Sequence, residues 1–425
     1  MKYLETFFDF IKSSTDAYNA VNTVKNRLLS AGYTELFEQD SWKLDDGGKY
    51  FVIRGGSSII AFRYKADAAG FMMASAHTDS PTFKIKPSAS TVGDYTRLDV
   101  EKYGGPILYT WLDKPLSVSG RIFVKTDSGI ASHLVNIDRD LAVIPSVALA
   151  MMPEINSALT LNVAKDMQPL FAMLNSEKSL AAIVAEYAGV DESSLISHDL
   201  VLYNRQQPTL FGAENEFVLS PRIDDLSCAY CAVEGFLEAD SSAAVPVLAL
   251  FDNEEIGSET KQGAASTFLY DVLHRISKTE EDYLRHLAAS FMVSIDVAHA
   301  RHPAHPELSD PANSPLMNGG VVLKYNANQR YATDGEAAGL FKIVCERACV
   351  PTQSFTVRAD KPCGSTLGHI SATVVSVPTV DIGIPQLAMH SATETAGAKD
   401  VDYMISAMKE YYSASIKRSG SIATI

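Results

Sequence analysis

The stretch from Val245 to Ser258 constrains the fold of this chain more than any other. Its first seven residues, Val245 to Phe251, are apolar and uncharged, a pattern typical of a short strand buried on both faces. The residues that follow are Asp-Asn-Glu-Glu-Ile-Gly-Ser. Three carboxylates at the rim of a core strand are costly unless something cationic neutralises them, and a divalent metal ion is the obvious candidate.

Polar residues of the same kind follow other apolar strands in the chain. We predict such strands at Phe71–Ala76, Phe291–Ile295 and Val375–Ile384, and they lead to His77, Asp296 and His390. Asp224 stands near the start of a predicted helix that reaches Leu237, where an aspartate suits the cap. Because ligands of an α/β sheet gather at the carboxyl ends of its strands, these side chains are expected to converge.

Two imidazoles and several carboxylates from separate loops suit a pair of divalent cations. Each cation would take one histidine and one carboxylate, and a further carboxylate would bridge the two. The mixture of oxygen and nitrogen ligands suits Zn²⁺, with Mn²⁺ or Co²⁺ as alternatives. A His-x-Asp or Glu-Glu pair alone is usually a surface feature, so the hypothesis depends on their recurrence at the ends of apolar strands.

The spacing within two of these segments indicates further roles. Residues i and i+2 of an extended backbone point to the same face, so Asp79 can accept the second ring N–H of His77 and fix its tautomer. Glu254 and Glu255 are neighbours whose side chains cannot both point the same way. One of them can bind metal while the other faces a bound water as the general base of a hydrolysis.

Length and charge limit the classes of function. A chain of 425 residues is too long for one hydrophobic core, so we expect two domains, one of them inserted in the other. With 46% hydrophobic and 20% charged residues, the composition is that of a globular protein. The net charge of −15 disfavours nucleic acid and anionic membranes as partners. An anionic substrate would need a local cation to hold it.

Sequence features also predict a cytoplasmic location. Met1 to Asp9 lacks the basic start and apolar core of a secretory signal, and the longest apolar-rich run, Leu141 to Pro153, is too short to span a bilayer. Five cysteines are an odd and sparse set, which suits reduced thiols. Cys228 and Cys231 form a Cys-x-x-Cys pair without a matching second pair, so buried helix-face thiols are favoured over a structural zinc site.

The pattern along the chain changes twice. Segments 1–89 and 208–425 alternate strands with helices, which predicts an α/β sheet with helices on both faces. Segment 90–207 is mostly strand-like and concentrates no catalytic residue types, so we interpret it as an inserted β domain for assembly or lid functions. Further predicted helices are Leu4–Ile11, Val21–Leu28, Ser179–Tyr187 and Asp400–Lys417, and further strands are Tyr50–Ile53, Ser58–Tyr64, Arg121–Lys125, Ile130–Val135 and Asp199–Tyr203.

Seven motifs, in this order, resemble those of the M18 metalloaminopeptidases, the aspartyl aminopeptidase family. They are Ser-Ala-His-Thr-Asp-Ser-Pro (75–81), Arg-Ile-Asp-Asp-Leu (222–226), Asp-Asn-Glu-Glu-Ile-Gly-Ser (252–258), Asp-Val-Ala-His-Ala (296–300), Lys-Tyr-Asn-Ala-Asn-Gln-Arg-Tyr-Ala (324–332), Pro-Cys-Gly-Ser-Thr-Leu-Gly (362–368) and Ala-Met-His-Ser (388–391). The resemblance covers nearly the whole chain, and so many ordered motifs make it specific. It implies a three-layer α/β/α zinc-peptidase domain carrying an inserted, mostly β domain.

The resemblance also implies a role for each residue of the predicted site. His77 and Asp296 would hold one zinc ion, and Glu255 and His390 the other. Asp224 would bridge the two ions. Two residues would be catalytic. Glu254 would be the general base that deprotonates the metal-bridging water, and Asp79 would orient His77.

Substrate and assembly are implied in the same way. Family members that prefer acidic residues hold the substrate carboxylate with a lysine and a histidine, at the positions of Lys324 and His299. Without the resemblance, Lys324 could equally be a solvated charge at a strand end. His299, His302 and His305 look like a turn beside Asp296 rather than a third metal site. Family members assemble as tetrahedral dodecamers with inward-facing active sites, which implies a homo-oligomer that admits only small peptides.

Three positions depart from the family pattern. Residues 144–150 resemble a segment that usually carries histidine, including at Ala150, where a neighbouring subunit's histidine reaches the active site. Thr393 replaces a common arginine, and His369 stands where proline or asparagine is usual. These departures bear on cross-subunit completion of the site and on strict acidic preference rather than on the core chemistry.

Our principal hypothesis is a cytoplasmic dizinc aminopeptidase that removes N-terminal residues, acidic ones included, from short peptides. A second hypothesis keeps the metals and changes the substrate, as in a carboxypeptidase or an N-acyl-amino-acid deacylase. A third is a metal-stabilised assembly protein that has lost catalysis. The Glu254-Glu255 pair argues against the third, because a structural site is closed and needs no base beside an open position.

Overall fold

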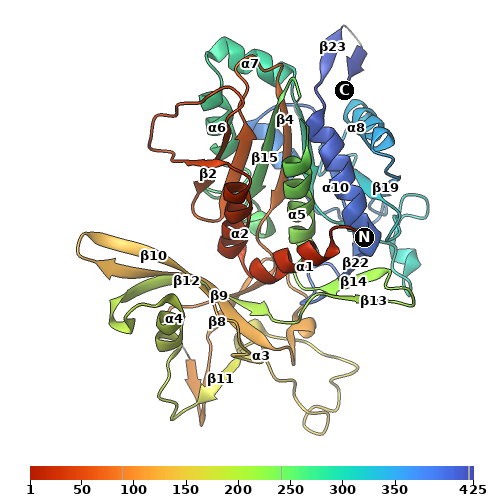
Figure 1. Ribbon diagram of the computed structural model, residues 1–425. Coiled ribbons are helices and arrows are strands. Elements are labelled where there is room, and N and C mark those ends of the chain that lie inside the picture. The colour runs from red at the N-terminus through yellow and green to blue at the C-terminus, as the bar shows by residue number, and fades with distance from the viewer. Residues whose placement is uncertain (89, 241, 420–421) are drawn as a thin grey trace.

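The computed structural model describes residues 1–88, 90–240, 242–419 and 422–425 and shows two lobes (Figure 1). The larger lobe is built on a nine-stranded sheet, and the smaller lobe hangs below it on a five-stranded sheet. In chain order, the strands of the large sheet are β1 (Thr34–Leu36), β2 (Lys49–Arg54), β3 (Ser58–Arg63), β4 (Phe71–His77), β15 (Val245–Phe251), β16 (Phe291–Ile295), β18 (Val321–Tyr325), β19 (Thr352–Thr356) and β20 (Thr379–Gly383).

The centre of the large sheet consists of four parallel strands. The order across the sheet is β1-β2-β3-β15-β4-β16-β20-β18-β19, and the pairs β15–β4, β4–β16 and β16–β20 are all parallel. Their carboxyl ends therefore meet at one edge, which faces the smaller lobe in Figure 1. All residues of β4, β15, β16 and β20 are buried, which explains the continuous apolar runs in the sequence.

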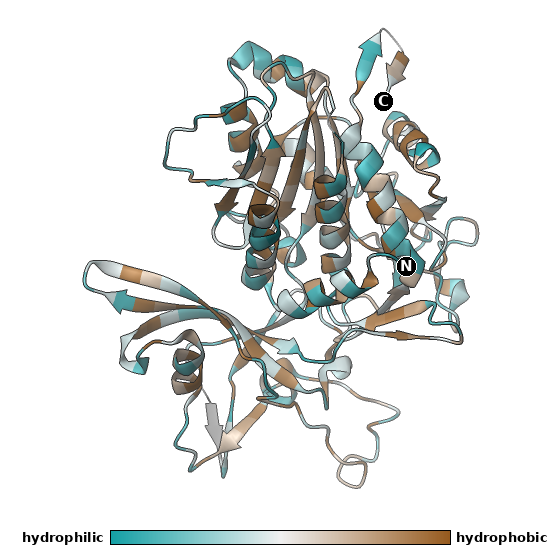
Figure 2. Ribbon diagram, viewed as in Figure 1, coloured by the Kyte–Doolittle hydropathy of each residue, from teal (hydrophilic) through white to brown (hydrophobic). Residues whose placement is uncertain are grey.

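Helices cover both faces of this sheet. In β4, Met72, Ala74 and Ala76 point to one core, whereas Phe71 and Met73 point to the other. The first core is closed by α1 (Leu4–Ser13), α2 (Ala17–Ser30), α5 (Ile223–Glu238), α8 (Gly335–Arg347) and α10 (Ala398–Ser413). The second core is closed by α6 (Phe268–Ile276), α7 (Glu280–Ala288) and α9 (Leu367–Val374). Figure 2 shows the apolar strands between helices with polar outer surfaces, and the predicted α/β/α layering is confirmed.

The break between the first two helices follows from a side-chain cap. The Asp16 carboxylate accepts hydrogen bonds from the backbone N–H groups of Tyr18 and Asn19, which satisfies two free donors at the start of α2. The predicted final helix begins and ends earlier than expected, as α10. The strand expected from Val375 begins only at Thr379, because α9 continues to Val374 and Pro378 cannot donate to a β ladder.

The smaller lobe has its own sheet and core. The sheet order is β10-β9-β12-β5-β8, with β5 (Thr82–Ile85), β8 (Val100–Tyr103), β9 (Leu116–Thr126), β10 (Gly129–Asn136) and β12 (Leu195–Asn204). The helix α4 (Leu180–Ala188) packs on it, and its core includes Phe83, Trp111, Ile122 and Leu200. The predicted 121–125/130–135 hairpin is found as the longer β9–β10 pair. Because β5 already belongs to this sheet, the sheet begins at Thr82, ahead of the boundary expected near residue 90.

The remaining elements form short pieces around these two sheets. One small sheet consists of β6 (Ser90–Val92), β7 (Tyr95–Arg97) and β11 (Leu170–Met173). A second consists of β13 (Thr209–Phe211), β14 (Phe217–Ser220), β22 (Glu394–Gly397), β21 (Pro385–Leu387) and β17 (Ala298–His299). A third consists of β23 (Lys417–Ser419) and β24 (Ile422–Thr424). The short helices are α3 (Val163–Asp166), η1 (Leu108–Trp111), η2 (Glu192–Ser194), η3 (Glu254–Ile256) and η4 (Pro306–Leu308).

None of the described helices has the length and apolar composition needed to cross a membrane. All five cysteines are free thiols, and Cys228 and Cys231 are buried in the core on α5, as favoured over structural zinc. No cysteine belongs to a metal-ligand cluster among the described residues.

Candidate metal centre

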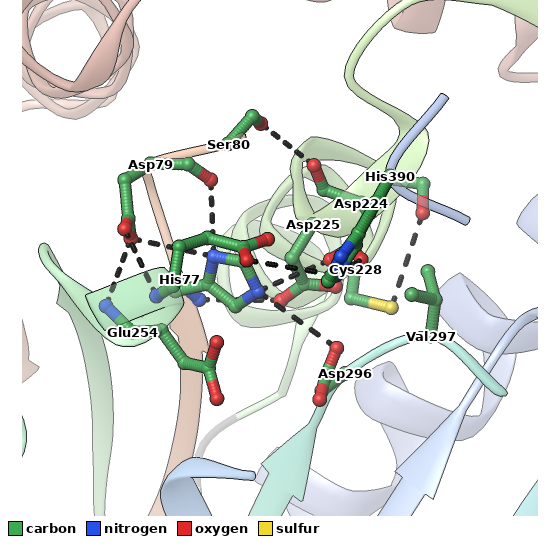
Figure 3. Close-up of polar contacts among 12 residues, drawn as sticks. His77, Asp79, Ser80, Asp224, Asp225, Cys228, Glu254, Asp296, Val297 and His390 are labelled. Carbon is green, nitrogen blue, oxygen red and sulfur yellow. Dashed lines mark hydrogen bonds and ion pairs between the residues drawn. The ribbon is translucent and has the colours of Figure 1, made fainter. Parts of the chain in front are cut away.

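The predicted ligands meet at the carboxyl edge of the four parallel strands (Figure 3). His77 is the last residue of β4, Asp296 follows β16 and Glu255 lies in η3 directly after β15. Asp224 lies at the start of α5, and His390 follows the β20–β21 segment. The five side chains, which come from positions up to 313 residues apart in the sequence, fall into clusters whose ligand atoms lie within 4.8 Å of one another.

Three of the loops that carry these residues contain non-glycine residues in the left-handed region. Arg222 has φ of 56°, Asn253 has φ of 66° and His390 has φ of 67°. Such conformations cost free energy and persist only where the surroundings hold them. Arg222, for example, donates hydrogen bonds to the backbone carbonyls of Ser14 and Ile11, which fixes the turn into α5.

His77 forms one half of the centre. Its Nδ1 lies 3.0 Å from the carbonyl oxygen of Asp79, so Nδ1 carries the proton and donates. The Nε2 atom of the neutral ring then has a lone pair, which faces Asp224 Oδ1 at 3.2 Å and Asp296 Oδ1 at 3.8 Å. Three electron-rich atoms directed at one point require either a proton or a cation between them.

His390 forms the other half in the same way. Its Nδ1 lies 3.2 Å from the carbonyl oxygen of Gly105, and its Nε2 faces Asp224 Oδ2 and Glu255 Oε2, each at 3.5 Å. The two oxygens of Asp224 therefore face different histidines. Two ligand atoms bound tetrahedrally to one zinc ion lie about 3.3 Å apart, so the spacing of these atoms fits a cation in each half with Asp224 between them.

Unpaired buried oxygens give a second test of this fit. Asp224 Oδ1, Asp225 Oδ1 and Glu255 Oε1 are buried and accept no hydrogen bond from the described part of the chain. Burying a carboxylate oxygen without a partner is costly, and these atoms lie beside the two histidines. The donor set of imidazole nitrogens and carboxylate oxygens is one that zinc prefers, so the residues present fit the metal.

The pKa values of the ligands reflect this crowding. Burial opposes the charged form of His77, but Asp225, Asp224, Asp296 and Asp79 outweigh it and raise the pKa of His77 well above its ordinary value. Burial and the charge of Asp224 likewise raise the pKa of Glu255. Both groups must give up protons to bind a metal ion, so protons and metal compete for this site.

Asp79 lies against His77, but its backbone carbonyl rather than the expected carboxylate is the nearer acceptor of the ring N–H. The tautomer of His77 is set at 3.0 Å by the backbone carbonyl of Asp79, while the carboxylate Oδ1 is 3.4 Å from the same nitrogen. The carboxylate instead accepts hydrogen bonds from the backbone N–H groups of Glu254 and Glu255, at 3.1 and 3.2 Å. Asp79 thus connects the His77 loop to the loop of the adjacent acidic pair.

Glu254 differs from the other acidic residues because its carboxylate is free. It makes no hydrogen bond or ion pair with other described residues, and Figure 3 shows only its backbone in contact with Asp79. Burial, with added repulsion from Asp296, Asp79 and Asp224 and an opposing effect of His77, raises the pKa of Glu254 to about 8. Glu254 also belongs, with His77 and Glu255, to a cluster of potential ligand atoms. A glutamate with a raised pKa and no other partner at such a cluster has the properties of a general base.

Three residues at the centre had no assigned role from sequence. The Asp225 carboxylate accepts a hydrogen bond from the backbone N–H of His77 and belongs to the same cluster of potential ligands. The Glu394 carboxylate accepts hydrogen bonds from the backbone N–H groups of Asp224 and His390, at 2.9 and 2.8 Å. Asp225 adjoins Asp224 and could have been suspected, whereas nothing in the sequence marks Glu394 or the carbonyl of Gly105.

Of the two predicted substrate-binding residues, only Lys324 has a direct contact with Asp296 among the described residues. Lys324 is buried, and its Nζ contacts Asp296 O at 3.0 Å, Val297 O at 3.1 Å and Asp296 Oδ2 at 3.3 Å. These three acceptors occupy the three donors of the ammonium group. His299 is exposed on β17, with its ring 6.0 Å from that of Phe355.

The departures from the family pattern lie outside the cluster of ligands. Ala150 is exposed in a long loop of the smaller lobe. The hydroxyl of Thr393 contacts the side chains of Asn204 and Gln206, and His369 Nδ1 donates to the carbonyl of Thr366. None of the three side chains belongs to the metal-ligand clusters of the described residues.

Comparison with known proteins agrees with this geometry. Residues 10–412 match the family described as aminopeptidase I zinc metalloprotease (M18). The chain is 41% identical over 427 residues to the probable M18 family aminopeptidase 2 of Clostridium novyi, covering 97% of this chain and 99% of that protein. It is 37% identical over 443 residues to aspartyl aminopeptidase 1 of Schizosaccharomyces pombe, covering 96% and 93% of the two chains.

Solved structures show the same fold. The Ape4 chain in a complex with Nbr1 superposes with a TM-score of 0.93 at 37% identity, covering 96% of this chain and 85% of that one. The S. cerevisiae mApe1 dodecamer gives a TM-score of 0.85 at 29% identity, covering 97% and 96%. The chain thus belongs to the M18 family of zinc metalloaminopeptidases, hydrolases that act on peptide bonds.

Proposed function

We propose that this enzyme binds two zinc ions and removes single residues from the N-termini of short peptides, with Glu254 as general base. The observation that carries the proposal is that the two carboxylate oxygens of Asp224 face the Nε2 atoms of two different histidines. His77 and Asp296 would hold one ion, and His390 and Glu255 the other. Asp225 belongs to the cluster of His77, Asp224 and Asp296 and has one buried oxygen without a hydrogen-bond partner among the described residues, so it is a further potential ligand.

Each residue then has a defined task. When bound, zinc polarises the scissile carbonyl and lowers the pKa of water at the site. Glu254 accepts the proton of the attacking water and later donates it to the leaving amine, for which its carboxylate is free of other contacts. Asp79 holds the backbone of Glu254 in place, and the carbonyls of Asp79 and Gly105 keep both imidazoles in the tautomer that presents Nε2.

The charge of the centre favours an N-terminal amine over a C-terminal carboxylate. Its seven acidic side chains outnumber the five positive charges of two divalent cations and the single ammonium of Lys324. These acidic residues are Asp79, Asp224, Asp225, Glu254, Glu255, Asp296 and Glu394. A substrate ammonium group placed at this cluster is attracted to the excess, whereas a terminal carboxylate in the same position is repelled. The charge balance therefore supports aminopeptidase over carboxypeptidase activity, and a blocked amine would lose the attraction.

We further propose a preference for acidic N-terminal residues and a homo-oligomeric assembly. The acidic preference is supported by the ammonium group of Lys324, which contacts Asp296, and by His299, three residues after Asp296 in the chain. Exposed His299 could contact the substrate, while buried Lys324 adds positive potential from behind Asp296. The assembly is supported by the likeness to the mApe1 dodecamer, and twelve copies are the expected number.

A panel of chromogenic aminoacyl substrates tests this function. The panel includes Asp, Glu, Leu and Lys derivatives, each with a free and an N-acetylated amine, together with peptides that differ only at the C-terminus. The enzyme is assayed after chelation and after return of Zn²⁺, Mn²⁺ or Co²⁺. We expect cleavage of free-amine substrates only, abolished by chelation and restored by metal. Hydrolysis of the acetylated series would indicate a deacylase, and no hydrolysis under any metal would refute the proposal.

A further inference from the structure

The smaller lobe reaches into the metal centre through the end of one strand. Tyr103 is the last residue of β8 and pairs with Thr82 at the start of β5, three residues after Asp79. This antiparallel pairing brings Tyr103 back over the loop that follows His77. The hydroxyl of Tyr103 lies 2.7 Å from Asp79 Oδ2, to which it donates a hydrogen bond.

The Tyr103 hydroxyl is itself fixed by a second contact. It accepts a hydrogen bond of 2.9 Å from the side-chain amide of Asn253, the residue immediately before Glu254. Asn253 is in turn held by Thr260 and Gln262, whose side chains donate to its Oδ1 at 2.8 and 3.1 Å. The hydroxyl therefore joins the two loops that meet at Asp79 and has both its donor and an acceptor position occupied.

Asp79 links the Tyr103 hydroxyl to the backbone of Glu254 and Glu255. Its carboxylate accepts from the backbone N–H groups of both Glu254 and Glu255, and Oδ2 accepts from Tyr103 and Glu255 together. Burial, followed by the charges of Asp79 and Asp252, raises the pKa of Tyr103, so its phenol stays protonated and remains a donor. The path from Tyr103 to Glu254 thus consists of two hydrogen bonds.

The residues after Tyr103 contact the other half of the centre. Gly104 has φ of 68°, and a Cβ there would lie 3.1 Å from Glu255 Cβ. The carbonyl of Gly105 accepts from His390 Nδ1. At Gly104 the positive φ and this close approach both favour glycine, whereas a Cβ at Gly105 would be in ordinary contact with His390 Nδ1 at 3.4 Å. Residues 103–105 therefore touch both halves of the centre from the smaller lobe.

We propose that Tyr103 is a positioning residue for the peptidase reaction, which acts through Asp79 to fix the backbone of Glu254 and Glu255. The proposal rests on the function proposed above, because Glu254 is taken there as the base. It assigns the smaller lobe a part in catalysis within a single chain. A shift of β8 relative to the large sheet would move the base and one ligand together.

The test compares Tyr103→Phe with Tyr109→Phe, a control six residues away whose ring is 62% exposed. Loss of an outer contact to a metal ligand typically costs about 10–100-fold in activity or metal affinity. We expect Tyr103→Phe to lower kcat by about this factor with KM nearly unchanged, and the control to retain wild-type kcat. The visible spectrum of the Co²⁺-loaded protein should also shift for Tyr103→Phe and not for Tyr109→Phe.

A double-mutant cycle with Asp79→Asn separates positioning from general destabilisation. If Tyr103 acts through Asp79, Tyr103→Phe should change kcat by less than about twofold in the Asp79→Asn background. Full additivity, or wild-type kcat and Co²⁺ spectrum in Tyr103→Phe, would overturn the proposal. These outcomes require an active wild-type enzyme, so failure of the proposed function would be seen first, as inactivity of the wild type in the substrate panel.

Discussion

The tautomers of His77 and His390 determine which ring nitrogens face the carboxylates of this centre. Because the carbonyls of Asp79 and Gly105 each accept from an Nδ1 atom, both Nε2 lone pairs are directed at carboxylates. A lone pair facing carboxylates is repulsive unless a cation lies between them. The backbone conformation of two loops therefore directs both nitrogens at the carboxylates, as the proposed metal site requires, and side-chain identity alone would not.

Glu394 should control how well that cluster is assembled. Its two oxygens accept the backbone N–H groups of Asp224 and His390, so an amide at this position would place a donor against a donor. We expect Glu394→Gln to weaken zinc binding by about 10–100-fold and to lower the free energy of unfolding by about 1–3 kcal/mol.

Competition with a chromogenic chelator and urea unfolding measure these two effects. Glu214→Gln is the matched control, since Glu214 is exposed and its carboxylate makes no hydrogen bond to the described residues. Equal zinc affinity in the wild type and Glu394→Gln would show that the Glu394 contacts are not needed to hold the ligands.

At the level of elements, close packing of adjacent strands sets where Asp296 lies. Gly383 ends β20, and a Cβ there would overlap the carbonyl oxygen of Asp296, which directly follows the neighbouring strand β16. Overpacking of this kind costs about 1–3 kcal/mol. We expect Gly383→Ala to lower stability by this amount and to reduce activity, because the strand ending in Asp296 must move.

A second glycine provides the contrasting control. Gly339 lies on the exposed face of α8, and a Cβ there would meet no atom within 4 Å. Replacing glycine by alanine inside a helix typically stabilises it by about 0.5–1 kcal/mol. Thermal unfolding of both variants should shift in opposite directions. Wild-type stability and activity in Gly383→Ala would contradict the packing argument.

Much of this architecture is predictable because local and global patterns agree. The apolar runs at β4, β15 and β16 indicate strands buried on both faces, and the polar residues after them indicate the edge where a site forms. The strand predicted from Val375 begins only at Thr379, because an apolar run does not distinguish the end of α9 from the start of β20.

The outer contacts of the site could not be predicted in this way. Tyr103, Gly105 and Glu394 lie in segments whose local sequence resembles ordinary strand and turn residues. Their roles arise from the pairing of β8 with β5 and of β22 with β21, and such long-range pairing leaves no mark on periodicity. For Lys324 the motif predicts a role that the local contacts extend. The resemblance implies a contact with the substrate, and in the structure its ammonium group also makes three contacts with Asp296 and Val297.

On the scale of the whole molecule, the buried acidic centre should make stability depend on metal and pH. Burial raises the pKa of Asp252 to about 7, with a further contribution from Asp79, and the pKa of Glu254 to about 8. Since the folded chain then binds more protons than the unfolded chain, stability without metal falls as pH rises from about 4.5 to about 8.

Zinc should remove most of this dependence. A metal that binds only the folded state adds about 2.7 kcal/mol at a concentration 100 times its Kd, and its positive charge favours the ionised carboxylates. We expect the Tm of the chelated protein to fall between pH 6 and pH 8 and that of the zinc-loaded protein to change little. Parallel pH profiles of Tm with and without zinc would contradict this account.

The central claim is that the zinc ligands and the base are separate residues within one centre. The most direct test measures zinc content and kcat together in Glu254→Gln. We predict about two zinc ions per chain, as in the wild type, and a kcat lower by about 10²–10⁴-fold, the usual contribution of a general base. A variant that keeps its zinc and its activity, or one that loses both together, would contradict the division of roles between Glu254 and Glu255.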